Sequence, residues 1–458
     1  MEPFASPNQL DPELNIFLEG ACSKLCKWFA HTNDFSPSPI ISNLPEVAPE
    51  SKGLPCEALL DDLQIIMDGA YRPSHPGALA HLDPPPLTSS IVADLICSGL
   101  NNNLLAYELS PGFSKLERKL CEWLSQSLGF TSPDSGGVFT SGGTISNLMA
   151  LVIARKSAGL QNDPDAVVLA SEEAHVSLLK AIRVMGLSKG SLNLISTNQN
   201  GQISLEALHD ELKILRKKGR KCFAIVATAG TTVRGSIDPL IEISEFCMRE
   251  GLWMHVDGAI GGVFALSSTT KDLVKGISSA NSVSINPQKL LGIAKTSSVL
   301  LLNNRNDLMS TFSTGLPYVE PSIGKDFHGG EIGLQGTRPA DVLKLWLGLR
   351  QLGKEGIQCL LEQSINRRLY LQKNIDLSKL DIVSGPLHLI AITPKEMNID
   401  FTSKWSEQTR LRLLEHKFML SRPFYKKQHY LKVVLGNPHT ENIHLDKLSE
   451  LLNQSVSS

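Results

Sequence analysis

The feature that most constrains the fold is an alternation of short apolar runs with segments of helical periodicity between residues 86 and 352. Six runs, rich in β-branched residues, have the length and composition of strands: 167–170, 192–195, 223–227, 253–256, 282–285 and 298–302. Runs that are apolar throughout are typical of strands buried on both faces. Strands that alternate with helices predict an α/β fold, in which a mostly parallel sheet carries helices on both faces.

The N-terminal segment, residues 1–85, differs from this pattern. It contains two helix candidates, 12–30 and 56–67, separated by a stretch rich in Pro and Ser. It leaves few apolar residues for a core of its own, so we expect a helical arm. The run Pro84–Pro86 marks its end, because proline is excluded from helix interiors and central strands.

Two further domains are predicted. Residues 86–352 form the large domain, which ends with a helix predicted from Val342 to Leu352. Residues 353–458 form a small C-terminal α+β domain. Its clearest elements are a strand at 431–435 and a closing helix at 445–452.

The composition narrows the class of protein. The chain has 458 residues, 42% hydrophobic and 20% charged, as in ordinary soluble globular proteins. A formal net charge of −2 gives no reason to expect nucleic acid or an anionic membrane as a partner. No apolar run reaches the ~18 residues that a membrane span needs. The acidic start (Glu2, Asp11, Glu13) does not resemble a secretory signal, so we expect a cytoplasmic protein.

The eight cysteines do not predict a metal site. Cys22 and Cys26 share a helix face, but no second Cys or His pair lies nearby to complete a zinc site. We expect buried free thiols in a reducing compartment.

A possible phosphate site follows the first strand of the large domain. Residues 138–151 read as a strand, a turn at two glycines and an apolar-faced helix. Free N–H groups at a helix N-terminus bind phosphate, and Gly143 lets the backbone approach it closely. Thr144 can add a hydroxyl. The alternative is a plain helix cap, since Ser, Thr and Gly have that role routinely.

Three more residues follow predicted strands. His175 lies between a strand and a helix, where a single His is usually a cap or surface residue. Asp257 ends an apolar strand, where a carboxylate is costly unless paired, for example with a pyridinium N–H; a helix cap is the alternative. Lys289 follows the strand 282–285, and a lone lysine there is usually a solvated charge. In this order, however, the four segments match a pyridoxal-phosphate site, in which enclosure should lower the lysine pKa.

Together these motifs resemble the group II pyridoxal-phosphate-dependent amino-acid decarboxylases, which include glutamate, aromatic-amino-acid, cysteine-sulfinate and 2,4-diaminobutyrate decarboxylases. The segments that carry the resemblance are Ser-Gly-Gly-Thr at 141–144, Ala-His at 174–175, Ala-Thr-Ala-Gly-Thr-Thr at 227–232, His-Val-Asp at 255–257 and Asn-Pro-Gln-Lys at 286–289. The resemblance implies the fold type I architecture of pyridoxal-phosphate enzymes. It also implies a homodimer with sites between subunits, and pyridoxal 5'-phosphate as the cofactor.

The resemblance also implies the role of each site residue. Gly143, Thr144 and Ser282 would contact the phosphate, Thr232 and His175 the ring, Asp257 the ring nitrogen and Lys289 the aldehyde carbon. Gln288 stands where the family usually has His; it can bind the phosphate but cannot titrate. Gly258 replaces the usual Ala, which we expect to loosen the floor under the ring.

Two other departures concern catalysis. Lys432 stands where many members have an Arg near the substrate carboxylate, so it gives a point charge instead of a bidentate fork. The loop 324–330 lacks the family's catalytic Tyr and has Phe327 and His328 at the matching place. His328 has the right unperturbed pKa for a proton donor, and Lys289 is the alternative donor. Relatives with Phe in this loop can divert to aldehyde-forming chemistry.

The substrate is predicted less narrowly. His81 stands where glutamate-type members have a polar substrate-binding residue, and Asp83 would favour a cationic tail unless it only caps a helix. The stretch 106–113 instead resembles glutamate-type members. We therefore expect decarboxylation of a small polar L-amino acid, with a 2,4-diaminobutyrate-like substrate slightly favoured over a glutamate- or aspartate-like one.

Three other functions stay open. They are an oxidative deaminase or aldehyde synthase on the same scaffold, an aromatic-amino-acid decarboxylase, and a cofactor-binding homologue without activity. The last is disfavoured because Lys289, Asp257 and His175 are all present.

Overall fold

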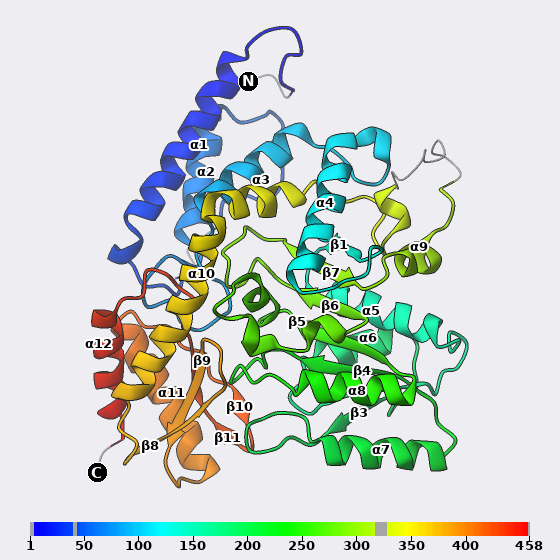
Figure 1. Ribbon diagram of the computed structural model, residues 1–458. Helices are drawn as coiled ribbons and strands as arrows, with labels where there is room; N and C mark the ends of the chain where they lie inside the picture. The colour runs from blue at the N-terminus through cyan, green and yellow to red at the C-terminus, as the bar shows by residue number, and fades with distance from the viewer. Residues whose placement is uncertain (1–3, 40–43, 317–327, 457–458) are drawn as a thin grey trace.

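The computed structural model describes residues 4–39, 44–316 and 328–456. Its centre is a seven-stranded sheet of order β1-β7-β6-β5-β4-β2-β3 (Figure 1). The strands are Gly136–Thr140 (β1), Val167–Ser171 (β2), Leu192–Ile195 (β3), Cys222–Thr228 (β4), Trp253–Gly258 (β5), Ser282–Ile285 (β6) and Ser298–Leu302 (β7). Only β7 runs against the others, since it pairs antiparallel with both β6 and β1. The predicted α/β fold with a mostly parallel sheet is confirmed.

Helices cover both faces of this sheet (Figure 1). On one face, Leu169 and Ile225 pack with α4 (Pro111–Ser127), α7 (Leu205–Lys217) and α8 (Leu240–Glu250). On the other face, Val168 and Val226 pack with α5 (Gly143–Ser157) and α6 (Ser177–Val184). Because successive strand residues point to opposite faces, burial on both sides requires the continuous apolar runs seen in the sequence. Each fully buried Val, Leu or Ile contributes roughly 1.5–3 kcal/mol.

The remaining helices of the large domain flank the sheet. They are α3 (Thr88–Leu100), which packs against α10, and α9 (Asn306–Phe312). Helix α10 (Val342–Asn374) is interrupted at Gly353, whose φ of 59° and ψ of −177° are not helical. Glycine tolerates a positive φ at no steric cost. The interruption falls where the C-terminal domain is predicted to begin.

The C-terminal part has a sheet and a core of its own. Three antiparallel strands lie in the order β12-β9-β8, with a two-stranded ribbon of β10 and β11 beside them. The bounds are Leu380–Ser384 (β8), Leu389–Pro394 (β9), Ile399–Glu415 (α11), Phe424–Tyr425 (β10), Gln428–His429 (β11), Leu431–Val434 (β12) and Asn442–Asn453 (α12). Ile390, Leu431 and Leu448 belong to a buried cluster that is separate from the core of the large sheet.

The N-terminal segment forms two helices, α1 (Pro12–Ala30) and α2 (Cys56–Asp68), which lie side by side at one side of the molecule (Figure 1). Asp11 caps α1 by accepting from the Leu14 N–H at 2.9 Å. No residue of α1 is buried in the single chain. Cys22 and Cys26 on this helix are exposed, as is Cys359 of α10, so the expectation of buried thiols is wrong for these three.

Membrane-spanning character is not found either. No helix within the described ranges is both long and apolar enough to cross a bilayer.

Candidate active site

The loops that follow the parallel strands meet at one edge of the sheet, where the carboxyl ends of parallel strands form a crevice. They enclose a cavity of about 260 Å³. Seven of the predicted site residues line it: Gly143, Thr144, His175, Thr232, Asp257, Gln288 and Lys289. The structure thus brings together residues from five separate segments, which include the first turn of α5 and the end of β5.

Lys289 lies in the turn after β6, where its N–H donates to the Asn286 carbonyl at 2.9 Å. Burial lowers the pKa of the Lys289 amine, while Asp257 and Asp83 act in the opposite direction. The net lowering brings the neutral, nucleophilic amine within reach, as expected from the sequence.

Asp257 is the penultimate residue of β5 and is held by Asn147 of α5. The Asn147 Nδ2 donates to Asp257 Oδ2 at 2.8 Å and to the Ser177 hydroxyl at 3.0 Å. Asp257 Oδ1 accepts from the Ala259 N–H at 3.2 Å. Asn147 was not predicted as a site residue, although it lies only three residues after the Ser-Gly-Gly-Thr motif. Its contacts make it the residue that orients the Asp257 carboxylate.

From Asn147 the hydrogen-bond network extends to buried side chains of β5 and β6. Asn147 Oδ1 accepts from the Ser284 hydroxyl at 2.9 Å and lies 3.1 Å from His255 Nε2. The other imidazole nitrogen, His255 Nδ1, lies 2.9 Å from the Ser282 hydroxyl. Burial, opposed by Asp257, lowers the pKa of His255 to about 4, so this imidazole is neutral. The chain of hydrogen bonds therefore fixes the direction of each member.

The expectation that Ser282 contacts the phosphate is wrong. Ser282 is the first residue of β6, and its hydroxyl accepts from the Trp253 indole at 2.9 Å. It does not line the cavity, because the cavity lies beyond Ile285 at the other end of the strand. At about 3.3 Å per residue the two strand ends are ~10 Å apart.

His175 forms part of the cavity wall and has a defined ring orientation. Its Nδ1 accepts from the Ser177 N–H at 3.2 Å, so a neutral ring carries its proton on Nε2. Burial lowers the pKa of His175, although the Asp257 carboxylate opposes the shift. The flat, neutral imidazole is suited to packing on an aromatic ring.

Asn286 and Gly143 lie next to each other in the wall of the cavity. Asn286 Oδ1 is buried and has no hydrogen-bond partner among the described residues. A Cβ at position 143 would lie only 3.1 Å from the Asn286 Nδ2, so any larger residue there would require the Asn286 side chain to shift. The N-terminus of α5 and this amide offer N–H donors that suit a phosphate. Asn286 was also missed as a site residue, although it opens the Asn-Pro-Gln-Lys motif.

Gln288 and Gly258, which differ from the residues usual in the family, both have a structural explanation. The Oε1 of Gln288 accepts from the Ser297 N–H at 2.6 Å, which leaves its amide N–H groups for the cavity. The expectation that Gly258 loosens the floor is wrong. A Cβ there would lie 2.9 Å from the Ser284 carbonyl oxygen and 3.2 Å from the Gly262 Cα, so backbone already fills the space.

A second cavity, of about 10 Å³, adjoins Lys289 on the side of the predicted substrate residues. His81 and Asp83 line it, as does His388 of the C-terminal domain. Asp83 is already paired, because its Oδ1 lies 2.6 Å from the Lys295 Nζ. Burial is the main cause that lowers the pKa of His81, and the nearby Lys432 adds to it.

Lys432 lies on β12 of the C-terminal domain and reaches the edge of the large sheet. Its Nζ donates to the Thr232 carbonyl at 3.3 Å. Burial, and then the charge of Lys289, lower the pKa of Lys432 to about 8. Lys432 lines neither cavity, but near neutral pH its cation contacts Thr232 of the larger one and acts on His81 of the smaller one.

The structure does not bring His328 to the cavity of its own chain. His328 precedes the short helix η6 (Gly329–Glu331), and its Nδ1 accepts from the Tyr107 N–H at 3.1 Å. Phe327, the other residue at the position of the family's Tyr, lies outside the described residues.

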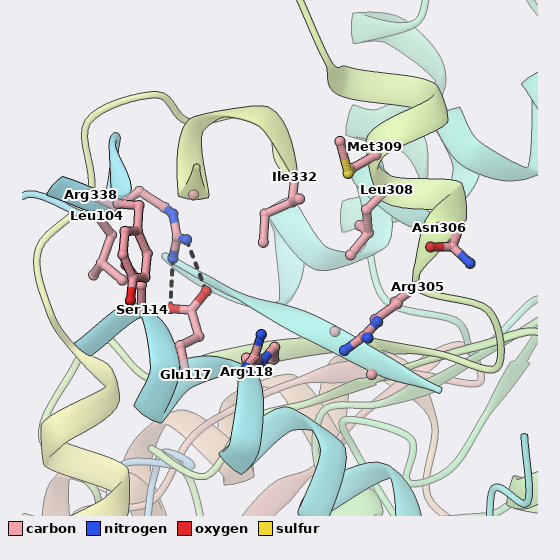
Figure 2. Close-up of a pocket in the computed structure, with 14 residues that line it drawn as sticks. Leu104, Ser114, Glu117, Arg118, Arg305, Asn306, Leu308, Met309, Ile332 and Arg338 are labelled. Atoms are coloured by element: carbon pink, nitrogen blue, oxygen red, sulfur yellow. Dashed lines mark hydrogen bonds and ion pairs between the residues drawn. The ribbon is translucent and has the colours of Figure 1, made fainter. Parts of the chain in front are cut away.

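The segment after His328 borders a separate cavity of about 60 Å³, shown in Figure 2. Gly329 and Tyr107 line it, beside the edge strand β1. Arg338 forms a buried bidentate ion pair with Glu117 in its wall, at 2.9 and 3.0 Å (Figure 2). Arg338 follows η6 in the chain, so this ion pair anchors the segment on the C-terminal side of His328.

Comparisons with known proteins identify the family of this chain. Residues 37–388 match the model of the pyridoxal-dependent decarboxylase conserved domain. The chain is 30% identical over 415 residues to the aromatic-L-amino-acid decarboxylase of Bacillus atrophaeus, covering 88% of this chain and 86% of that protein. It is also 30% identical over 370 residues to the cysteine sulfinic acid decarboxylase of Rattus norvegicus, covering 78% of this chain and 72% of that protein.

Solved structures show the same architecture. A crystal structure of mouse CSAD in apo form superposes with a TM-score of 0.88 at 25% identity, covering 97% of this chain and 99% of that one. The Oryza sativa TDC structure with PLP and tryptamine, at 18% identity, gives a TM-score of 0.90 over 99% of both chains and supports the fold. This chain therefore belongs to the pyridoxal-dependent decarboxylases, the group II amino-acid decarboxylases, and is a carboxy-lyase that uses pyridoxal 5'-phosphate.

Proposed function

We propose that this enzyme decarboxylates a small L-amino acid with an acidic side chain, in the cytoplasm, as a homodimer with shared active sites. The observation that carries the substrate class is the pairing of Asp83 with Lys295 at 2.6 Å. It neutralises the one carboxylate that favoured a basic substrate. The cation of Lys432 beside the same site is left to attract an anion.

The residues present fit the cofactor. The Asn286 amide N–H groups, the close approach at Gly143 and the N-terminus of α5 suit a phosphate end, and Gln288 can add an amide N–H. Asp257 suits a protonated ring nitrogen, and Lys289 supplies the amine that binds the aldehyde covalently. When bound, pyridoxal phosphate supplies a protonated ring that accepts the electron pair released as the Cα–carboxylate bond breaks.

Each residue then has a defined task. Asp257, oriented by Asn147, keeps a proton on the ring nitrogen. His175, neutral and fixed by the Ser177 N–H, packs on the ring and excludes water from one face. Lys289 would bind the cofactor aldehyde in the free enzyme and could hold a proton near the substrate Cα during the reaction.

The acidic class revises the sequence-based preference for a diaminobutyrate-like substrate. That preference depended on a free Asp83 carboxylate, and the Lys295 amine now compensates it. The curated relatives support the revision only in part, since they include cysteine sulfinic acid and acidic amino acid decarboxylases but also an aromatic one.

The homodimer gives His328 its proposed role. His328 lies outside the Lys289 cavity of its own chain, so it can donate a proton only in the site of a partner subunit. A shared site of this kind predicts that two variants defective in amine formation complement one another. In a mixture of Lys289→Ala and His328→Phe subunits, about half of the dimers are hybrid and each has one intact site, so about a quarter of the wild-type activity should return.

The proposal is tested with purified enzyme and a panel of acidic, basic and aromatic L-amino acids, with amine, CO₂, aldehyde and hydrogen peroxide measured separately. We expect amine and CO₂ from an acidic amino acid, and loss of the near-ultraviolet to visible cofactor band in Lys289→Ala. Turnover confined to basic or aromatic amino acids would refute the substrate class. Aldehyde with hydrogen peroxide as the main products would instead establish the oxidative alternative.

A further inference from the structure

His388 of the C-terminal domain lies directly behind the cofactor lysine. It precedes β9 and lines the small cavity together with Lys289 and His81. Its side chain is only 2% exposed. The cavity volume of about 10 Å³ is close to the space that a single water needs. A polar ring therefore faces a space that admits about one oxygen atom.

The imidazole is held in place by backbone contacts on both sides. Arg368 donates to the Leu387 carbonyl at 3.0 Å, and the Leu435 N–H donates to the His388 carbonyl at 2.9 Å. The ring itself stacks on Phe264, with centroids 6.2 Å apart and planes 26° apart. Its position is thus set before any ligand arrives.

The two ring nitrogens of His388 have different surroundings, and Nε2 is the one on the side of the cavity residue Gly436. His388 Nδ1 is buried and has no hydrogen-bond partner in the described part of the chain. The opposite edge faces Gly436, where a Cβ would lie 3.6 Å from Cδ2 and 3.7 Å from Nε2, and Gly436 lines the same cavity. Because a buried N–H without an acceptor is rarer than an unpaired acceptor, the proton belongs on Nε2.

The charged groups around the ring keep it neutral. Burial is the main cause that lowers the pKa of His388 to about 3, and Arg367, Lys289 and Lys432 all act in the same direction. At working pH the residue is therefore a neutral donor with one N–H, beside cations that attract an anionic oxygen.

We propose that His388 is a substrate-positioning residue. Its Nε2–H donates to one oxygen of the α-carboxylate of the amino acid, in the small cavity between Lys289 and His81. The inference rests on the proposed function, because it requires an amino-acid substrate at Lys289. In the free enzyme a water takes the place of that oxygen. The volume of about 10 Å³ suits a single oxygen atom, so the subsite would also orient the substrate.

Two substitutions separate donation from packing. His388→Phe keeps a ring against Phe264 but has no N–H, whereas His388→Gln keeps an N–H donor. His429→Phe is the matched control, since this histidine is in the same domain but lines neither cavity. For each holoenzyme we would measure cofactor absorbance, then KM and kcat with the best amino acid of the panel.

We expect His388→Phe to raise KM about 10-fold or more, which is the loss of one hydrogen bond to a charged group. The change in kcat should be smaller, His388→Gln should recover most of the affinity, and the cofactor band should be unchanged in both variants. An unchanged KM in His388→Phe would overturn the proposal. So would an equal loss in both variants together with loss of the cofactor band, which indicates a structural role.

The outcome is independent of the proposed substrate class. If the wild type turns over a basic or aromatic amino acid instead of an acidic one, that class is wrong, and the KM of the variants for that amino acid still decides the role of His388.

Discussion

Replacement of Asn147 by leucine is the most informative test of how the site is held together. The two side chains have nearly the same shape, so the substitution removes hydrogen bonds and leaves little cavity. In the wild type, the Asn147 amide donates to Asp257 and Ser177 and accepts from Ser284 and His255. Asp257, Ser177 and His255 would each lose a hydrogen bond to Asn147, whereas Ser284 has a second contact, with Asp257.

The magnitude follows from the groups left behind. The Asp257 carboxylate loses a 2.8 Å hydrogen bond, and a bond to a charged group is worth roughly 1.5–3 kcal/mol. The His255 Nε2–H loses its acceptor in a fully buried place, which costs about 1–3 kcal/mol. Ser284 keeps a weaker contact with Asp257 Oδ1 at 3.4 Å. We expect the free energy of unfolding to fall by about 3–5 kcal/mol.

The assay is urea unfolding of the holoenzyme at fixed protein concentration, followed by tryptophan fluorescence. Trp253 reports on the network directly, because its indole donates to Ser282 at 2.9 Å. Ser282→Ala tests the other end of the network; it leaves the Trp253 indole and His255 Nδ1 without this partner and should cost about 1–3 kcal/mol. A loss below ~1 kcal/mol for Asn147→Leu would show that the network does not stabilise the site, and our reasoning would be wrong.

Three further predictions concern catalysis. Asp257→Asn should retain the cofactor but react on the order of 10³-fold more slowly, because an amide cannot keep the ring nitrogen protonated; a near-normal rate would show that the carboxylate is only structural. Burial lowers the pKa of Lys432 to about 8, so its amine is a cation below that pH and neutral above it. The KM for an anionic substrate should therefore rise as the pH increases through about 8, and Lys432→Met should have a high KM without this pH dependence. His328→Phe should raise the fraction of turnovers that end in aldehyde or transamination, and an unchanged product ratio would assign the proton to Lys289.

The sequence predicted the large sheet well because its strands are buried on both faces. The apolar runs at 192–195, 282–285 and 298–302 coincide with β3, β6 and β7 as the structure has them. Asp257 and Lys289 were found for a related reason, since a polar residue just after a buried strand must lie at the sheet edge where the loops converge. Local order along the chain was enough for these features.

Contacts between distant segments were not predictable in this way. Asn147 and Asp257 are 110 residues apart, and nothing near Asn147 indicates which carboxylate it will meet. Ser282 was misplaced because a motif match does not say at which end of a strand a side chain lies. The pairing of Asp83 with Lys295 was equally hidden, since it joins the end of the arm to a loop behind the cofactor lysine.

The place of β1 in the sheet has a consequence for synthesis of the chain. Within the described ranges β1 pairs with β7 alone, so that Gly136 meets Leu302, and the helix that begins with Gly143 follows β1 after a two-residue turn. During translation β1 is left as an unpaired edge until most of the large domain has emerged, and such edges promote aggregation. Contacts of this sequence separation also slow folding. The pocket for the phosphate is thus completed late, and a nascent chain that ends before β7 should be unable to retain the cofactor.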